Sequence, residues 1–303
     1  MTTPILKHKI AICVSGQTRQ MNEDQNIQKF LEALQIFENE FEVDYYGHTW
    51  ADQEDPDPII LNKFREYKKE DQSVIWDTIT APNNIVQIDD RHGWTYWFQT
   101  KESWMTDPEY RAILDGTSDT SYIDFAKERI YGTVGQIWSA HQSFNLVKDT
   151  LKKEQYKAVI RLRWDTSLQW NNGRLVTEEQ IERFKQQLHD WIDSKNDFAQ
   201  YNCCCLVSDQ AHFRDWGIPF FNDFCFVFRP SDVNVIKNII FGDIMKVFKN
   251  IFNMPHMQHL HAAHSLWAHY LIATLPEGRI TPMLPNIFTA SGTPYKSNKR
   301  WGI

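Results

Sequence analysis

One short stretch constrains the fold of this chain more than any other. Residues 156–167 read YKAVIRLRWDTS, in which a run of apolar residues is followed by an abrupt change to polar ones. An unbroken apolar run is typical of a strand that helices cover on both faces. Because ligands bind at the carboxyl ends of the strands in open α/β sheets, the polar end of this run predicts a binding site.

Three charged residues at the end of this strand, Arg161, Arg163 and Asp165, allow two interpretations. The two guanidinium groups could bind the oxygens of a diphosphate, while the carboxylate holds a divalent cation or a sugar hydroxyl. Alternatively, Asp165 pairs with Arg163 or Arg161 in a salt bridge at the strand end. The stretch by itself favours neither interpretation.

The N-terminal segment predicts the start of a βα unit. Residues 9–15 form an apolar, β-branched run that ends at Gly16, and apolar residues recur at helical spacing over residues 27–37. In nucleotide-binding proteins such a unit brings backbone N–H groups and a helix N-terminus to phosphate. The turn that would do so reads Ser15-Gly16-Gln17-Thr18-Arg19. The alternative is a plain βα turn in which the glycine is needed for a positive φ.

Three further elements follow from the pattern of the next residues. Residues 42–50 read as a second strand that ends in GHTW, where His48 could contact a base or ribose, or the end could be a packed corner. Helical spacing predicts a helix over residues 59–67. Residues 84–88 read as a third strand.

The middle of the chain combines an irregular segment with a long helix. Residues 91–130 are rich in aromatic residues near their start and have no regular period, which predicts an inserted lid or lobe over the site. Apolar residues at helical spacing predict a helix over residues 133–153. Its polar residues Gln136, Ser139 and Gln142 could face the site.

A candidate functional carboxylate lies in the second half of the chain. Asp223 opens an apolar run over residues 224–228, which reads as a buried strand. A carboxylate in this position needs a partner, a metal or a substrate hydroxyl. The alternative is a structural hydrogen bond to nearby backbone.

Two helices and a strand are predicted around this carboxylate. Thr177 opens a helix with a capping-box pattern, and the helix is expected to end near residue 193. The three consecutive cysteines at 203–205 read as a buried strand. Ser231 and Asp232 could cap a helix that ends near residue 251.

The C-terminal part holds five histidines within residues 256–269, at a spacing that contains no H-E-x-x-H motif. One of them could be a metal ligand, although a solvated or core histidine face also explains the cluster. Residues 285–303 are irregular and end in a basic tail, which could fold back onto a diphosphate.

Composition limits the class of protein. The chain has 303 residues, 42% of them hydrophobic, and no linker rich in Pro, Gly or Ser, which predicts a single domain over residues 1–303. A net charge of −7 argues against a nucleic-acid binder. Five cysteines without a secretory signal indicate reduced thiols, and no apolar run reaches the length of a membrane span, so we expect a cytoplasmic protein. The oligomeric state stays open.

Taken together, these motifs resemble those of GT-A-fold glycosyltransferase-like proteins of bacterial surface-polysaccharide clusters, large phages and viruses. The matching segments are KIAICVSGQTR, VDYYGHTW, GQIWSAHQSFNLVK, YKAVIRLRWDTS and FFNDFCFVFRPSDV. The resemblance implies a Rossmann-like α/β fold with a mixed, mostly parallel sheet that helices flank. It also implies a nucleotide-diphosphate-sugar donor, a glycan or small-molecule acceptor, and Mn²⁺ or Mg²⁺ at the diphosphate.

The resemblance assigns roles to particular residues as well. Ser15, Gly16 and Arg19 would lie at the nucleotide, Asp165 would bind the metal, and Asp223 would act near the acceptor as a base or hydroxyl anchor. The half of the chain up to about residue 167 would face the nucleotide, and the half from about residue 168 would face the acceptor. The remaining candidate donor-binding residues are Gln17, His48, Arg161 and Arg163.

One departure from the family pattern bears on activity. The usual acidic motif is D-x-D, whereas this chain has Asp165-Thr166-Ser167. Either Asp223 or a histidine of residues 256–269 completes a metal site, or the arginines replace the metal, or activity has been lost. Some cation is required in a transferase, because the leaving diphosphate gains negative charge as the glycosidic bond breaks. The alternative function is a non-catalytic nucleotide- or carbohydrate-binding protein that keeps the fold.

Overall fold

A computed structural model gives the fold of the chain. It describes residues 7–18, 22–74, 120–151, 155–170, 174–193, 203–205, 224–236, 267, 271, 280–282 and 287–290. Within these residues the strands of the main sheet follow the order β3-β2-β1-β4-β8-β7-β9. Their bounds are β1 Lys9–Ser15, β2 Glu42–Trp50, β3 Phe64–Glu70, β4 Ala158–Arg163, β7 Cys203–Cys205, β8 Cys225–Phe228 and β9 Ile280–Pro282.

The sheet is mixed and mostly parallel. Strands β3, β2, β1 and β4 run parallel to one another, and β7 runs parallel to β9. Strand β8 is antiparallel to both of its neighbours, β4 and β7. A small second sheet has the order β10-β5-β6, with bounds β5 Thr166–Trp170, β6 Arg174–Leu175 and β10 Phe288–Ala290. The predicted fold class, a mixed α/β sheet flanked by helices, is confirmed.

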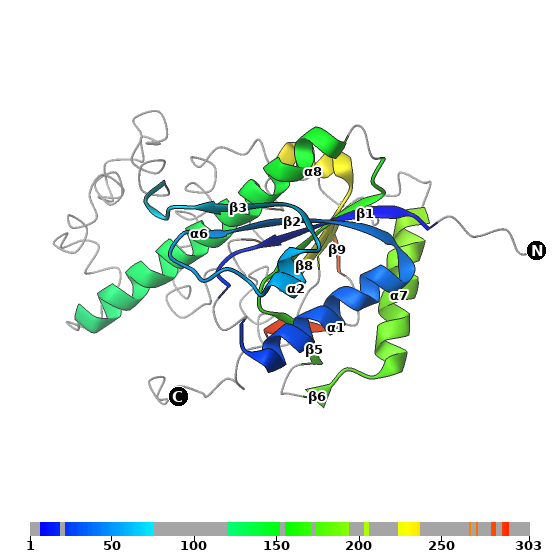
Figure 1. The fold of residues 1–303 in the computed structure, drawn as a ribbon, viewed down its shortest axis with the longest axis horizontal. Coiled ribbons are helices and arrows are strands. Elements are labelled where there is room, and N and C mark those ends of the chain that lie inside the picture. Colours follow the sequence, from blue (N-terminus) through cyan, green and yellow to red (C-terminus); the bar gives the residue numbers. More distant parts are fainter. Residues whose placement is uncertain are drawn as a thin grey trace, which may run out of the picture.

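Helices cover both faces of the main sheet. On one face α1 (Asp24–Glu40) and α7 (Glu178–Asp193) pack against the alternate β1 residues Ile10, Ile12 and Val14. On the other face lie α6 (Thr120–Leu151) and α8 (Pro230–Ile236), and the thiol of Cys13 donates to the carbonyl of Ser143 on α6. Figure 1 shows α1 and α8 on opposite sides of the strands. Because successive strand residues point to opposite faces, this arrangement explains the unbroken apolar run of β1.

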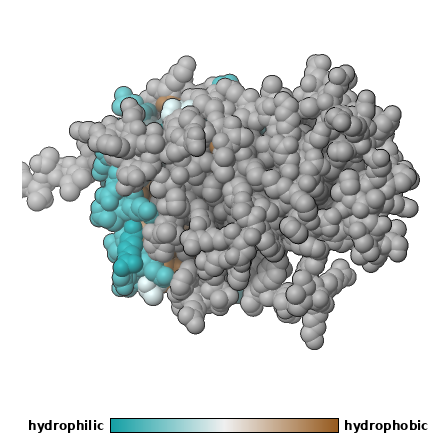
Figure 2. Space-filling view, turned by 180° about the vertical axis from the view of Figure 1, so that it is seen from behind, coloured by the Kyte–Doolittle hydropathy of each residue, from teal (hydrophilic) through white to brown (hydrophobic). Residues whose placement is uncertain are grey.

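The outer layer is formed in part by the amphipathic helix α7. Its buried residues face the sheet, and its outer surface forms a hydrophilic stripe (Figure 2). The predicted capping box is present at its start, since the N–H of Thr177 donates to Gln180 and the N–H of Gln180 donates to Thr177 Oγ1. The exposed residues of this helix are Glu178, Glu179, Glu182, Arg183, Gln186, Asp190 and Asp193.

The prediction of a helix over residues 59–67 is wrong. Only Pro58–Leu61 is helical, as α2, and Phe64–Glu70 is the strand β3. Phe64 packs its ring against Trp164, with ring centroids 5.2 Å apart, while β3 pairs with β2 along its length. Cross-strand pairing and this contact outweigh a helical spacing that extends over too few residues to stabilise a helix by itself.

Two other predicted boundaries also change. Helix α6 begins at Thr120, so the last residues of the segment predicted to be irregular (91–130) are helical. Helix α8 begins at Pro230, which places Ser231 and Asp232 inside its first turn instead of at its cap. Proline suits this position because its missing N–H would have no partner in the first turn.

Several predictions fall on residues outside the described ranges. They are Arg19, the strand at 84–88, residues 91–119, Asp223, the helix portion 237–251, the histidines of 256–269 and most of the C-terminal tail. The division into a nucleotide-facing and an acceptor-facing half also stays a prediction. In the described part of the chain, no helix is long and apolar enough to cross a membrane.

Candidate functional site

The sheet reverses its strand order between β1 and β4. From β1 the chain continues through α1 to β2 and β3 on one side, and α6 then leads back to β4 on the other side of β1. Helices α1 and α6 lie on opposite faces of the sheet. Such a reversal leaves a crevice outside the carboxyl ends of the two central strands, which is where open α/β sheets bind ligands.

Three of the predicted site residues form a single row at this edge. Ser15 of β1 has His48 of β2 as its register partner on one side and Arg163 of β4 on the other. Lys68 of β3 extends the row beyond His48. The structure therefore brings together residues that are up to 148 positions apart (163 − 15 = 148) in the sequence.

Gly16 makes the turn that follows β1. Its φ of 111° is a conformation that L side chains rarely adopt. Its N–H donates to Ser139 Oγ at 2.8 Å, and its carbonyl accepts from Thr49 Oγ1 at 2.8 Å. Apart from Gly16 itself and its two chain neighbours, no heavy atom of the described residues lies within 4 Å of the position that a Cβ on Gly16 would take. The N–H of this buried glycine is thus used inside the protein, while no described side chain fills the position of a Cβ.

The residues after Gly16 are held against the loop that follows β2. Thr18 Oγ1 donates to the carbonyl of Glu54 at 2.9 Å. Asn22 donates to the Glu54 carboxylate at 3.1 Å and to the carbonyl of Asp55 at 2.9 Å. Gln17, which lies between Gly16 and Thr18, is exposed. Thr18 and Asn22 therefore attach the segment after β1 to the loop after β2, and Gln17 is accessible to solvent.

Asp165 is bound by Arg163. The Arg163 Nε and Nη2 atoms lie 2.8 and 2.6 Å from the two carboxylate oxygens. The guanidinium also lies over the ring of Phe224, 4.6 Å from its centroid. Only 16% of the Arg163 side chain and 10% of the Asp165 side chain are exposed. Of the two interpretations of this stretch, the structure shows the strand-end salt bridge.

This pair does not by itself fit a divalent cation. Hard cations need several oxygen ligands, and here one carboxylate has both oxygens engaged by a guanidinium. In the ranges that the structure describes, no group of three His, Cys, Asp or Glu side chains could hold a metal ion. A metal role for Asp165 stays a prediction that would need ligands from elsewhere, such as Asp223.

Arg161 lies deeper than Arg163. Its side chain is fully buried, its Nε donates to Ser15 Oγ at 3.1 Å, and its guanidinium lies 5.7 and 5.5 Å from the ring centroids of Phe226 and Trp267. The rings provide cation–π stabilisation for the buried charge. Arg161 and Ser15 are thus in contact, with the positive charge placed behind the Ser15 hydroxyl and away from solvent.

The end of β2 is a packed corner. His48 and Thr49 are fully buried, and Trp50 is 2% exposed. The indole N–H of Trp164 donates to the His48 carbonyl at 2.9 Å and fixes this corner to the end of β4. Direct contact between His48 and a nucleotide stays a prediction, and this burial favours an indirect contribution.

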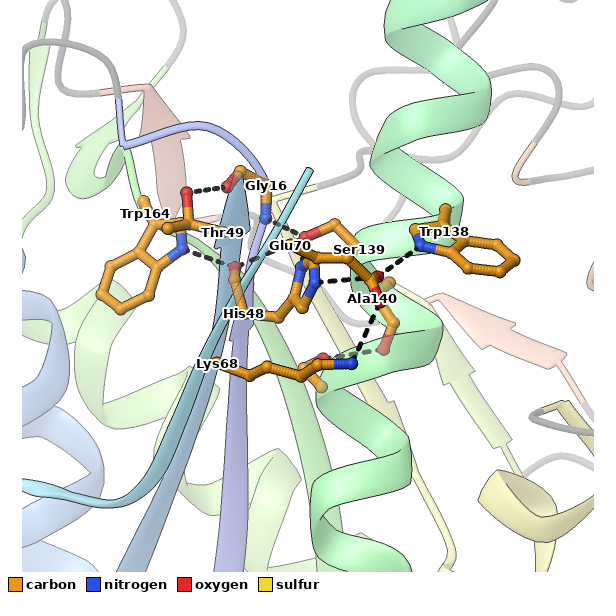
Figure 3. A network of polar contacts seen from close by, with 10 residues as sticks. Gly16, His48, Thr49, Lys68, Glu70, Trp138, Ser139, Ala140 and Trp164 are labelled. Carbon is orange, nitrogen blue, oxygen red and sulfur yellow. Dashed lines mark hydrogen bonds and ion pairs between the residues drawn. The ribbon is translucent and has the colours of Figure 1, made fainter. Parts of the chain in front are cut away.

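The His48 ring belongs to a buried polar network (Figure 3). Its Nδ1 lies 2.8 Å from Ser139 Oγ on α6, and its Nε2 lies 3.4 Å from Glu70 Oε2 at the end of β3. Trp138 donates to the same Glu70 oxygen at 2.9 Å, and Lys68 donates to the other oxygen at 3.0 Å. The network links β1, β2, β3 and α6 through two side chains, Ser139 and His48.

Burial decides the charge state of this network. Burial lowers the pKa of His48 to about 4, and the attraction of Glu70 opposes this only in part, so the imidazole is neutral at pH 7. Burial acts to raise the pKa of Glu70, but hydrogen bonds from Trp138 and Lys68, with the charge of Lys68, bring it below its usual value. Glu70 is therefore a carboxylate at pH 7.

Sequence reasoning missed Glu70 because residues 59–67 were assigned to a helix, so no strand end was expected nearby. Had FREYKKE been read as a strand, Glu70 would have been found at its carboxyl end, beside the other candidates. Ser139 was expected to face the site, and it lies against the Gly16 turn.

The fold and the site together define a mixed α/β protein with a polar constellation at a topological switch point. No family model and no curated protein sequence matches the chain. Among solved structures, it is similar to the apo form of mouse xyloside xylosyltransferase 1, with 9% sequence identity over 92% of this chain and 85% of that chain and a TM-score of 0.38.

Proposed function

We propose that this protein is a glycosyltransferase that moves a sugar from a nucleotide-diphosphate-sugar donor to a hydroxyl of a glycan or small acceptor. One observation carries the nucleotide part of the proposal. Ser15, His48 and Arg163 lie in one row at the switch point of a mostly parallel sheet, next to a glycine turn where no described residue fills the position of a Cβ. The sugar-transfer part is supported by the motif resemblance described above.

In this reaction the bond between the anomeric carbon and the diphosphate oxygen breaks, and its electron pair leaves with the nucleoside diphosphate. The acceptor oxygen forms the new bond to the anomeric carbon, and its proton passes to a base. Asp223, which immediately precedes Phe224 in the chain, is the candidate base. Phe224 contacts Arg163, so the chain enters the site at this residue.

The chain's own cations are the candidates for stabilising the leaving group. Arg163 is partly exposed at the end of β4, and Arg161 lies buried behind Ser15. Their positive charges, in surroundings with little water, would favour the charge that develops on the diphosphate. Because the donor set at Asp165 does not fit a cation by itself, the proposal assigns no step to a metal.

Thermal-shift measurements with UDP-, GDP-, CMP- and dTDP-sugars test the nucleotide part, each with and without Mn²⁺. A ligand that binds only the native state raises the melting temperature by mass action. A shift with one nucleotide would identify the base, and its dependence on Mn²⁺ would show whether a metal takes part. If no donor produces a shift, the transferase proposal loses its support.

The variant Arg163→Lys tests the site. Lysine keeps the charge but lacks the planar fork that binds two oxygens at once, so the donor-induced shift should shrink. Arg183→Lys is the matched control, because Arg183 is an exposed residue of α7 that pairs with Glu179. Equal shifts in both variants would place the donor away from β4.

A second candidate function is a non-catalytic nucleotide- or carbohydrate-binding protein. The engagement of both Asp165 oxygens by Arg163 favours it, because the chain then lacks a free acidic pair at this strand end among the described residues. Mass spectrometry of donor incubated with the protein distinguishes the two. Hydrolysis or transfer of the sugar supports the transferase, whereas tight binding without turnover supports the binding protein.

A further inference from the structure

We propose that Ser139 is a positioning residue that presets the Gly16 turn for the donor diphosphate. This inference rests on the proposed function, because it assigns a role in the same site to a residue of α6. The turn would then need little rearrangement when the ligand binds, which lowers the cost of binding.

The Ser139 hydroxyl joins three separate parts of the fold. It accepts the N–H of Gly16 at 2.8 Å, lies 2.8 Å from Nδ1 of His48, and lies 3.4 Å from the His48 carbonyl oxygen. Ser139 itself is fully buried. One side chain of α6 therefore ties the end of β1 to the end of β2.

The directions of these hydrogen bonds form a consistent chain. If Ser139 accepts from Gly16 and donates to Nδ1 of His48, the ring proton is on Nε2 and faces the Glu70 carboxylate, 3.4 Å away. Glu70 is held in turn by the indole of Trp138. Figure 3 shows these side chains grouped beside Gly16; Ser139 hydrogen-bonds both Gly16 and His48, while the contact of His48 Nε2 with Glu70 lies within ion-pair distance and is not a hydrogen bond.

Ser143, a serine of the same helix, behaves differently. Its hydroxyl donates to the carbonyl of Ala140 at 2.7 Å, whereas Thr150, which donates to the carbonyl of Val147, also hydrogen-bonds the Tyr46 hydroxyl of β2 at 2.9 Å. A bond to a carbonyl of the preceding turn is the usual use of a hydroxyl inside a helix. Ser139 instead bonds to Gly16, directly after β1, and to His48 of β2. Its hydroxyl therefore stabilises the Gly16 turn and not the helix alone.

The hydrogen bond from Gly16 to Ser139 stabilises the turn because it holds one of the two backbone polar groups of Gly16. Ser139 fixes its N–H and Thr49 fixes its carbonyl, and φ at this residue is 111°. Without the hydroxyl, a freely rotating glycine would sample other conformations that are equally open to it. The turn would then no longer be held in the single conformation that it has in the structure.

The test compares Ser139→Ala with Ser143→Ala, a matched control of the same residue type on the same helix. The first readout is amide hydrogen exchange at Gly16, which needs no ligand. The second is the affinity for the nucleoside diphosphates UDP, GDP and dTDP, measured by calorimetry. Ser139→Cys, which keeps the shape of the side chain with a slightly larger atom and makes only weak hydrogen bonds, serves if the alanine variant does not fold.

We expect Ser139→Ala to speed exchange at Gly16 by roughly tenfold and to weaken nucleotide binding by a similar factor, the effect of losing one buried hydrogen bond. Ser143→Ala should change neither. Unchanged exchange at Gly16 in Ser139→Ala, or equal losses of affinity in the two variants, would overturn the role of Ser139. If the wild-type protein binds no nucleotide, the proposed function fails, and the exchange data alone then decide whether Ser139 holds the turn.

Discussion

Both carboxylate oxygens of Asp165 accept hydrogen bonds from the guanidinium of Arg163, the residue two positions earlier in the chain. The pair lies at the end of β4, and Arg163 is the register partner of Ser15. A carboxylate that the sequence offers as a metal ligand is thus engaged within its own strand end. Whether the site works with a metal or with its own cations depends on how firmly this pair is held.

Replacing Asp165 with Asn should reduce the free energy of unfolding by roughly 2–4 kcal/mol, because the largely buried guanidinium of Arg163 loses its counter-charge. Urea denaturation at pH 7 measures this change. Glu179→Gln is the control, since Glu179 forms an exposed pair with Arg183 and its loss should matter little. A cost no larger than that of the control would mean that Asp165 is available to another partner.

Gly16→Ala should reduce the free energy of unfolding by about 1–3 kcal/mol through backbone strain at a φ of 111°. It should also weaken nucleotide binding, because the new methyl group enters the space at the turn. Denaturation and calorimetry measure the two effects separately.

Gly47→Ala is the comparison for this prediction. A Cβ there would lie 2.8 Å from a ring carbon of Phe64 and 2.9 Å from one of Tyr67, so overpacking should cost about 1–3 kcal/mol. The methyl group at Gly47 would point toward Phe64 and Tyr67, on the face of the sheet opposite to the His48 side chain, so nucleotide affinity should be unchanged in the folded fraction. If both variants lose affinity equally, the space at Gly16 is not where the ligand approaches.

Acidification should destabilise the protein between pH 6.5 and about 4. Burial lowers the pKa of both His48 and His141 to about 4, so between these values the unfolded state binds more protons than the native state. The stability is fully present above pH 6.5 and is lost as the pH falls toward 4, by at most about 3 kcal/mol for each histidine. Urea denaturation at several pH values gives the slope.

The variant His141→Gln checks the origin of that slope. It removes one of the two titrating rings and leaves the Ser139 network in place, so the loss of stability between pH 6.5 and 4.5 should be about half that of the wild type. An unchanged slope would show that other groups control the acid transition.

Trp164→Phe should reduce the free energy of unfolding by more than the loss of ring volume explains. The indole N–H donates to the carbonyl of His48, and the ring packs in a buried cluster with Phe30 and Phe64. Phe30→Leu removes ring volume from the same cluster without breaking that hydrogen bond. The excess cost of Trp164→Phe should be about 1–2 kcal/mol by chemical denaturation, and no excess would mean that the hydrogen bond contributes nothing net.

Local patterns were sufficient for the main strands. The β-branched run at 9–15, the strand at 42–50 and the apolar run at 158–160 are each found where they were predicted, because both faces of these strands are buried and their composition shows it. Strand β3 could not be found in this way. It has exposed charged residues, and its pairing partner β2 supplies most of what makes it a strand.

The candidate site was only partly predictable for the same reason. The sequence suggested that Ser15, Gly16 and Ser139 face one site, but not that the Ser139 hydroxyl bonds to the turn. Nor could it choose between Arg161 and Arg163 as the partner of Asp165. Phe226 and Trp267 enclose Arg161, and both are far from it in the chain.

What the sequence determined by itself was local: buried strands, the need for glycine after β1, and the capping box of α7 between Thr177 and Gln180. These features depend on residues within a few positions of one another. Only the tertiary structure decided the strand order and therefore the row of His48, Ser15 and Arg163. Hydrogen bonds between strands join residues that are distant in the chain, so their partners exist only once the sheet has formed.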